Sequence, residues 1–147
     1  LHLCDRRQRQ MCIRDRNEGI ARIVTSAYIM RFDPDMEEME DVKTAVSEAV
    51  TNCIVHAYFD ENGKIEMDIS DKEQIVKIEI TDHGIGIPDV KKAMEPMYTT
   101  KPEEERTGMG FSFMEAFMDE VHVYSKEGEG TKVIMTKKMG EKNHLNG

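Results

Sequence analysis

The segment SEAVTNCIVHAY, residues 47–58, carries three polar side chains at the spacing of one helix face. Glu48, Asn52 and His56 recur every fourth residue, so a helix places each of them one turn above the last. An amide oxygen suits Mg²⁺, and a carboxylate one turn away can hold or deprotonate a hydroxyl group beside that metal. Polar residues at this spacing often only face solvent, but here apolar neighbours surround them. The segment therefore predicts a helix whose polar row borders a buried stripe.

Two helices are predicted in the first half of the chain. Apolar residues between positions 39 and 57 form the stripe of a helix expected over about residues 36–58. Upstream, residues 20–28 repeat apolar side chains at i, i+3, i+4, i+7 and i+8, which is typical of one helix face. That first helix should end near Arg31, because the sequence FDPD at residues 32–35 favours a turn.

Four short strands and one further helix are predicted in the rest of the chain. Alternation of apolar and polar residues indicates the strands, and Asn62-Gly63 and Gly128-Glu129-Gly130 mark turns before and between them. The strands cover about residues 65–69, 75–80, 121–123 and 133–135, and the helix covers about residues 111–119. Helices and strand pairs in this order predict a two-layer α/β sandwich, a mixed sheet covered on one face by helices.

Length and composition favour a single globular domain. The 147 residues are 39% hydrophobic and 33% charged, and the net charge is −9. An acidic surface argues against non-specific nucleic-acid binding, and we find no apolar run long enough to span a membrane. The three cysteines suggest neither a disulfide framework nor a metal set, so we expect reduced thiols in the cytoplasm.

The first 16 residues differ from the rest of the chain. They hold five arginines and two aspartates, a net charge of +3, and show no clear apolar period. Two interpretations are open: a basic arm for an acidic partner, or a leader foreign to the domain. We expect a non-native-looking or disordered leader over residues 1–16, the domain over residues 17–138, and a polar tail over residues 139–147.

Two glycine-containing motifs follow the helix that carries Asn52. DHGIGI at residues 82–87 comes directly after a predicted strand, where a carboxylate can accept a hydrogen bond from an exocyclic amine such as that of adenine. Its glycines let the backbone approach a flat ring closely. TGMGF at residues 107–111 precedes a predicted helix, whose exposed N–H groups would attract phosphate. Each motif alone also fits an ordinary turn or cap, and neither is a Walker loop, but three motifs in this order can surround one nucleotide.

The ordered combination resembles the GHKL superfamily of gyrase, Hsp90, histidine kinase and MutL ATPases. Residues 47–58 resemble its N box, residues 82–87 its first glycine box, residues 107–111 its second, and Gly130-Thr131 its late Gly-Thr element. Within the superfamily, MYTTKPEEERTGMGF and FMEAFMDEV resemble the anti-sigma serine kinases of sporulating bacteria. The resemblance covers about residues 17–138 and implies the Bergerat ATP-binding fold.

The resemblance also implies roles for individual residues. Glu48 would be the base or orienting group for a serine hydroxyl of a partner protein, Asn52 would hold Mg²⁺, and Asp82 would bind the adenine amine. Residues 94–110 would form a lid over the phosphates, and Arg106 would approach the γ-phosphate when the partner docks. The other residues implied to lie at the nucleotide are His56, Gly84, Gly86, Thr99, Thr100, Lys101, Gly108, Gly110 and Thr131.

Three of these roles have a second interpretation. His56 would either contact phosphate through water or only support packing. Thr131 would either touch the adenine side or be an ordinary strand threonine. Arg22, on the first helix, would either contact a partner protein or simply be an exposed helix residue.

The implied function is that of an anti-sigma factor and ATP-dependent protein-serine kinase. It would use ATP/ADP and Mg²⁺, bind a sporulation sigma factor, and phosphorylate an anti-anti-sigma protein on serine. A general-stress kinase of the same superfamily and a non-catalytic, nucleotide-gated sigma-factor binder are the alternatives, and Glu48 favours catalysis over the latter. The family forms homodimers with a short strand before the first helix, which residues 1–16 do not resemble, so the dimer is not predicted for this chain. We expect no direct nucleic-acid or membrane partner.

Overall fold

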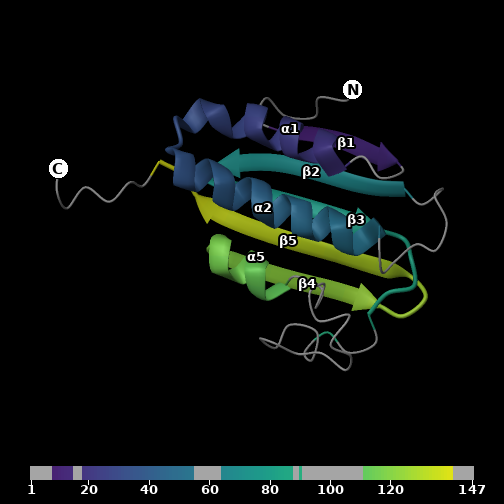
Figure 1. Ribbon diagram of the computed structural model, residues 1–147. Coiled ribbons are helices and arrows are strands. Elements are labelled where there is room, and N and C mark those ends of the chain that lie inside the picture. The colour runs from purple at the N-terminus through teal and green to yellow at the C-terminus, as the bar shows by residue number, and fades with distance from the viewer. Residues whose placement is uncertain (1–7, 15–17, 55–63, 88–89, 91–110, 141–147) are drawn as a thin grey trace.

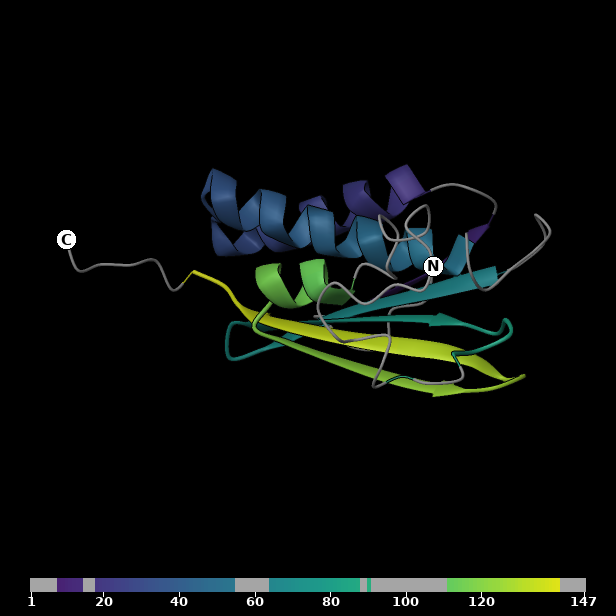
Figure 2. The same ribbon diagram turned by 60° about the horizontal axis from the view of Figure 1, so that its bottom comes forward.

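Helices cover one face of an antiparallel sheet in this protein. The computed structural model describes residues 8–14, 18–54, 64–87, 90 and 111–140. In this part of the chain a five-stranded sheet lies beneath helices α1, α2 and α5 (Figure 1). The view in Figure 2 separates the two layers, with the helices on one side and the sheet on the other. This arrangement confirms the predicted two-layer α/β sandwich.

The helices are α1 (Glu18–Ile29), α2 (Met36–Asn52) and α5 (Phe111–Phe117), with a short 3-10 helix, Met30–Phe32, between the first two. The strands are β1 (Gln8–Arg14), β2 (Lys64–Lys72), β3 (Ile75–Asp82), β4 (Glu120–Lys126) and β5 (Gly130–Lys138). Their order in the sheet is β1-β2-β3-β5-β4.

All four described strand pairs are antiparallel, so the expected mixed sheet is wrong. Short turns join β2 to β3 and β4 to β5, and connections of this length permit only antiparallel pairs. The two hairpins then meet along β3 and β5, which also run in opposite directions. A parallel neighbour would have needed a longer crossover.

The folded unit is longer at both ends than expected. Strand β1 pairs with β2 along its whole length, from Gln8 opposite Ser70 to Arg14 opposite Lys64, whereas the sequence predicts that residues 1–16 lie outside the domain. The arginines of β1 leave no clear alternation of apolar and polar residues from which to predict a strand. Strand pairing relies on backbone hydrogen bonds, which every residue except proline can form. At the other end Met139, expected in the polar tail, is fully buried. Strand β1 is therefore a short strand before the first helix, a feature that the sequence of residues 1–16 does not predict.

The start of α2 shows a capping box that the sequence analysis did not use. Asp35 accepts a hydrogen bond from the Glu38 backbone N–H at 2.7 Å, and the Glu38 carboxylate accepts one from the Asp35 N–H at 3.2 Å. Asp33 takes a left-handed backbone conformation with φ 52° and ends the preceding 3-10 helix. Helix α2 is a regular α-helix over Met36–Asn52 and continues as a π-helical turn at Cys53 and Ile54. The rest of the predicted helix, up to residue 58, lies outside the described residues.

The core lies between the inner faces of the two layers. Alternate residues of β2, β3 and β5 point toward the helices and are buried, and each large one contributes about 1.5–3 kcal/mol to folding. From the sheet these residues are Ile65, Met67, Ile69, Val76, Ile78, Ile80, Val133 and Met135. From the helices they are Ala21, Tyr28, Ile29, Val42, Ala45, Val46, Ala49, Val50, Phe111 and Met114.

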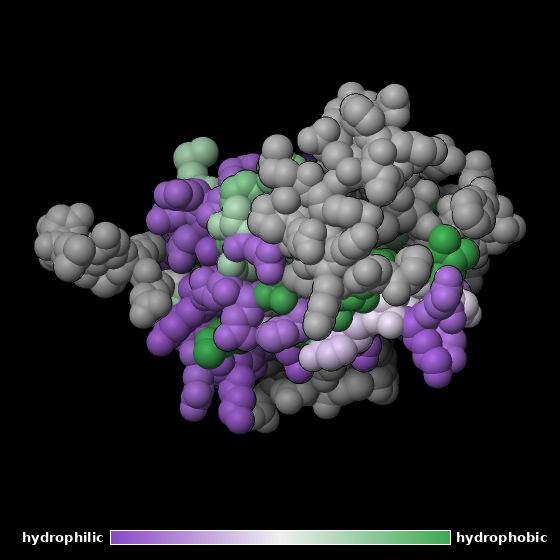
Figure 3. Space-filling model, turned by 90° about the horizontal axis from the view of Figure 1, so that it is seen from below, coloured by the Kyte–Doolittle hydropathy of each residue, from purple (hydrophilic) through white to green (hydrophobic). Residues whose placement is uncertain are grey.

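The opposite face of the sheet and the β4 edge are polar. On that face Glu79 lies 3.3 Å from the Lys77 ammonium and 3.6 Å from that of Lys132. Figure 3 views the molecule from the edge formed by β4 and α5, where hydrophilic residues dominate the described surface. A charged edge strand resists pairing with a second chain. No helix in the described part of the chain is long and apolar enough to cross a membrane.

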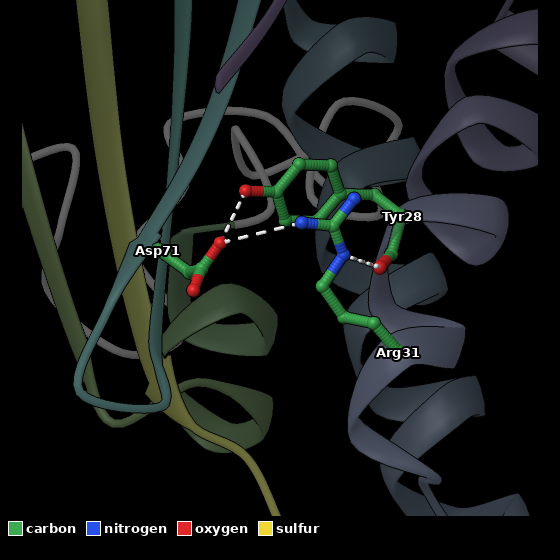
Figure 4. A network of polar contacts seen from close by, with 3 residues as sticks. All are labelled: Tyr28, Arg31 and Asp71. Carbon is green, nitrogen blue, oxygen red and sulfur yellow. Dashed lines mark hydrogen bonds and ion pairs between the residues drawn. The ribbon is translucent and has the colours of Figure 1, made fainter. Parts of the chain in front are cut away.

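A polar network joins the end of α1 to β2 (Figure 4). The Tyr28 hydroxyl donates a short hydrogen bond to the carboxylate of Asp71, whose side chain is only 3% exposed. The Arg31 guanidinium lies 3.7 Å from the same carboxylate, 4.0 Å from the Tyr28 ring centroid, and donates to the Tyr28 carbonyl at 3.1 Å. The phenol and guanidinium thus compensate a buried carboxylate that would otherwise destabilise the fold.

Replacing Tyr28 by phenylalanine should lower the free energy of unfolding by about 1–3 kcal/mol, because Asp71 would lose a buried hydrogen-bond donor. Urea unfolding followed by circular dichroism measures this change. Tyr124→Phe is the matched control, since Tyr124 is 58% exposed and its variant should stay within about 0.5 kcal/mol. Equal stability of the two variants would show that the network does not hold α1 to β2.

Candidate active site

Asp82 is a buried carboxylate at the end of β3. Its side chain accepts a hydrogen bond from the Gly84 backbone N–H at 2.9 Å, and the residue is 4% exposed. No lysine, arginine or histidine in the described ranges forms an ion pair with it. A buried charge without a cation needs further hydrogen-bond donors. The carboxylate is therefore suited to accept a hydrogen bond from a bound ligand.

The end of α2 meets this carboxylate through Cys53. Burial of the thiol, followed by the charge of the nearby Asp82 carboxylate and hydrogen bonding to it, raises the pKa of Cys53 well above the usual value. Asn52 directly precedes Cys53, and Glu48 lies one helical turn earlier; both side chains are half-buried and engaged in polar interactions. The structure thus brings Asn52 and Asp82, from two separate motifs, to the same end of the sandwich.

The start of β5 lies against the end of β3 because glycine occupies position 130. Asp82 and Thr131 are opposite each other in the antiparallel pair, and both are buried. Gly130 has φ +110°, and a Cβ atom there would clash with the backbone carbonyl of Asp82. Gly86, with φ +81°, would similarly clash with the carbonyl of Lys126. Both positions need glycine for conformation and for space.

Residues 84–87 are held to the β4–β5 hairpin by specific hydrogen bonds. The Ile87 N–H donates to the Ser125 hydroxyl at 2.6 Å, and the Gly128 N–H donates to the Ile85 carbonyl at 2.7 Å. The Ser125 and Thr131 hydroxyls are 2.8 Å apart. The sequence analysis missed Ser125, because a serine near a strand end carries no pattern that singles it out.

A pocket of about 290 Å³ opens at this end of the sheet. That volume is at the small end of the range for ligand sites. Its walls come from the ends of β3 and β4 and the start of β5. The lining residues are Thr81, Asp82, His83, Tyr124, Ser125, Lys126, Glu129, Gly130, Thr131 and Lys132. In Figure 1 the ends of α2, β3 and β4 and the start of β5 lie at the same end of the molecule.

Several predicted site residues cannot be placed. The described residues do not include His56, Thr99, Thr100, Lys101, Arg106, Gly108 and Gly110, nor the expected lid. Gly84 is half-buried beside Asp82, and Arg22 is exposed on α1. The structure therefore brings together the parts of the site contributed by α2, β3, the glycine segment and β5.

A sequence profile described as "Histidine kinase-like ATPase domain" matches residues 10–137. The anti-sigma F factor of Clostridium perfringens is 53% identical over 124 residues, covering 84% of this chain and 89% of that protein. The anti-sigma F factor of Clostridium novyi is 52% identical over 127 residues, covering 86% and 89%. The chain belongs to the anti-sigma F factor family of histidine kinase-like ATPase domains. This membership agrees with the resemblance found in the sequence.

Solved structures support the same fold. The catalytic domain of histidine kinase ThkA superposes with a TM-score of 0.59 at 19% identity, covering 92% of this chain and 99% of that domain. The RsbU and RsbW domains of Rv1364c from Mycobacterium tuberculosis give a TM-score of 0.61 at 17% identity, covering 89% of this chain and 32% of that one. At these identities the two structures inform the fold alone. This chain and the catalytic domain of ThkA thus share one fold.

The raised pKa of the buried Cys53 thiol predicts how stability depends on pH. Below the unfolded thiol pKa of about 8.5 the thiol is protonated in both states, so its contribution is constant. Above that pH the unfolded thiol ionises while the folded one stays protonated. The free energy of unfolding should therefore fall by up to about 1.4 kcal/mol per pH unit, until the folded pKa is reached.

Urea unfolding of the wild-type protein and Cys53→Ala between pH 7 and pH 10 measures this effect. The alanine variant lacks the titrating group, so the difference between the two proteins should change only above about pH 8.5. Parallel pH profiles would show that the folded thiol ionises as easily as the unfolded one.

Proposed function

We propose that this protein is an ATP-dependent serine kinase and anti-sigma factor, which binds a sporulation sigma factor and phosphorylates an anti-anti-sigma protein on serine. The observation that carries the proposal is the meeting of the buried Asp82 carboxylate with the end of α2, next to Asn52. Relatives that share about half of their residues with this chain are named anti-sigma F factor. Such proteins act where sigma factors act, so we also propose a cytoplasmic location.

The base-binding part of the proposal rests on the chemistry of Asp82. An ionised carboxylate only accepts hydrogen bonds, and the exocyclic amine of adenine donates them. Guanine has a carbonyl oxygen at the equivalent position, which a carboxylate would repel. Asp82 is buried and lacks a paired cation in the described residues, so adenine satisfies it better than guanine does. Gly84, Gly86 and Thr131 would shape the same pocket.

The metal-binding part of the proposal rests on Asn52. Among the described residues no group of three or more His, Cys, Asp or Glu side chains could hold a metal ion. Mg²⁺ takes one or two protein ligands when nucleotide phosphates and waters supply the others, so the amide oxygen of Asn52 fits this requirement. Bound Mg²⁺ would neutralise charge on the phosphates during transfer.

Glu48 is the proposed catalytic residue for the partner's serine. It lies one helical turn before Asn52 and is half-buried on the same helix. A carboxylate there can accept the proton of a serine hydroxyl or orient that hydroxyl toward the γ-phosphate. Arg106 would stabilise charge on the γ-phosphate, and His56, Thr99, Thr100, Lys101, Gly108 and Gly110 would lie at the phosphates. These seven residues are outside the described part, so their roles stay predictions.

The partner surface is proposed to include Arg22. This residue is exposed on α1, and its neighbour Ile23 is 68% exposed. An exposed arginine beside an exposed aliphatic side chain is a combination that protein partners use. A homodimer is also proposed, because strand β1 is present at the edge of the sheet.

The sporulation branch is favoured over a general-stress kinase by similarity. The similar proteins named anti-sigma F factor are 48–53% identical to this chain over most of its length. A nucleotide-gated binder without catalysis remains the second candidate function. Glu48 in the active-site helix argues for catalysis.

Glu48→Gln should leave ATP binding intact and slow phosphoryl transfer by about 10²-fold or more, because the amide cannot take the serine proton. The measurement is single-turnover transfer from Mg-ATP to a cognate anti-anti-sigma protein, with phosphoserine detected by mass spectrometry. Glu40→Gln is the control, since Glu40 is exposed two turns earlier on the same helix. Sigma-factor binding without phosphoserine formation in the wild type would instead favour the non-catalytic binder.

Asp82→Asn should weaken the binding of ADP and ATP by about tenfold or more without weakening that of GDP and GTP, because the carboxylate is proposed to accept from the adenine amine and to repel the guanine carbonyl. Isothermal titration of each nucleotide measures the change. Asp68→Asn, a carboxylate on the other face of the sheet, should have no effect. A uniform loss for all four nucleotides would refute base recognition by Asp82.

A further inference from the structure

Ser125 lies where three segments of the candidate site meet. It is the penultimate residue of β4 and is half-buried. Its Oγ atom lies 2.6 Å from the Ile87 backbone nitrogen, 2.8 Å from the Thr131 Oγ1 and 3.1 Å from the Gly130 carbonyl oxygen. One side chain therefore joins β4 both to the glycine segment and to the start of β5.

The Ser125 and Thr131 hydroxyls have one proton each, which limits which of these contacts can be hydrogen bonds at the same time. A serine hydroxyl has one proton to donate and two lone pairs to accept. The Ile87 N–H can only donate, so it occupies one lone pair of Ser125. The Gly130 carbonyl can only accept, so the Ser125 proton goes either to that carbonyl or to Thr131.

These two arrangements give Thr131 different roles toward the pocket. If Ser125 donates to Gly130, Thr131 donates to Ser125, and only its lone pairs remain for a ligand. If Ser125 donates to Thr131, the Thr131 proton is free to reach a ligand. Ser125 thus lets Thr131 act as either donor or acceptor, and it also fixes the position of the Thr131 hydroxyl.

The direction of the hydrogen bond between Ser125 and Thr131 matters because Asp82 lies opposite Thr131. Asp82 is its partner across the β3–β5 pair, and both residues are buried on the face of the sheet that the helices cover. The carboxylate only accepts hydrogen bonds, whereas adenine presents a donor amine next to the ring nitrogen N1, which accepts. Recognition of both groups needs an acceptor and a donor together, and Thr131 can supply the donor, directly or through water.

We propose that Ser125 is a positioning residue for adenine recognition, which orients the Thr131 hydroxyl and anchors the Ile87 end of the glycine segment to β4. The inference rests on the proposed function, in which Asp82 and Thr131 bind adenine. In this role Ser125 does not contact the reacting atoms.

If Ser125 only held the segments together, without orienting the Thr131 hydroxyl, its substitution would change nucleotide binding in a different way. Loss of a clamp would loosen the whole site and weaken every nucleotide in the same proportion. Loss of hydroxyl orientation would weaken adenine nucleotides selectively, and the effect would depend on Thr131. Two measurements therefore separate the two roles: whether the loss of affinity is larger for adenine nucleotides than for others, and whether that loss depends on Thr131.

The experiment is isothermal titration of ADP and GDP into Ser125→Ala, Ser125→Thr, Thr131→Val and the Ser125→Ala/Thr131→Val double variant. We expect Ser125→Ala to weaken the binding of ADP about tenfold, which is the scale of one hydrogen bond, and the binding of GDP by less than about twofold. Ser125→Thr keeps the hydroxyl and should restore ADP binding to within about threefold. In the Thr131→Val background, Ser125→Ala should have little further effect.

Ser70→Ala is the matched control, because Ser70 is a half-buried strand serine on β2. An equal loss of ADP and GDP in Ser125→Ala, or effects of the two substitutions that simply add, would overturn the inference. Failure of Ser125→Thr to bind ADP better than a folded Ser125→Ala would also overturn it. If Ser125→Ala does not fold, Ser125→Thr against Ser125→Cys, a weak donor of similar size, gives the same comparison.

Asp82→Asn separates this inference from the proposed function. If that variant binds ADP as the wild type does, the adenine site itself is wrong. If it loses ADP while Ser125→Ala keeps it, only the role of Ser125 is wrong.

Discussion

The Asp82 carboxylate lies where β3, β5 and α2 meet, and its burial constrains each of these elements. The Gly84 backbone N–H in the glycine segment donates a hydrogen bond to it, and the buried Cys53 thiol at the end of α2 lies close enough for Asp82 to raise its pKa. The start of β5 approaches so closely that only glycine fits at position 130. A buried carboxylate with these neighbours and no paired cation in the described residues is stable only with good hydrogen-bond donors. The same requirement that organises the end of the sheet makes it receptive to an amine-bearing ligand.

The sandwich supplies the rigidity that such a site needs. The inner faces of β2, β3 and β5 pack against α1 and α2, so the end of α2 cannot shift without disturbing the core. At the opposite end of β2, Tyr28 and Arg31 compensate the buried Asp71. Buried carboxylates therefore occur at both ends of the sandwich. The protein itself compensates Asp71, and we propose that a bound ligand adds a hydrogen bond to Asp82.

Sequence patterns predicted the sandwich because periodicity reports burial. The stripe from Met39 to Cys53 and the alternation in β2 and β3 follow directly from one buried face each. Strand β1 was missed, because its register depends on backbone pairing and its arginines conceal any alternation. The mixed sheet was wrong because hydrophobic pattern does not encode strand direction. Asp82 was singled out from its motif, whereas Ser125 matters only through contacts with residues distant in sequence, which no local pattern can reveal.

The central claim is that α2 and the end of β3 bind one magnesium-bound adenine nucleotide. A crystal structure of the protein with ADP and Mg²⁺ tests it most directly. We expect the adenine amine to lie within hydrogen-bond distance, about 2.7–3.2 Å, of the Asp82 carboxylate, and the Asn52 amide oxygen to coordinate Mg²⁺. Adenine bound away from Asp82, or Mg²⁺ held without Asn52, would contradict it.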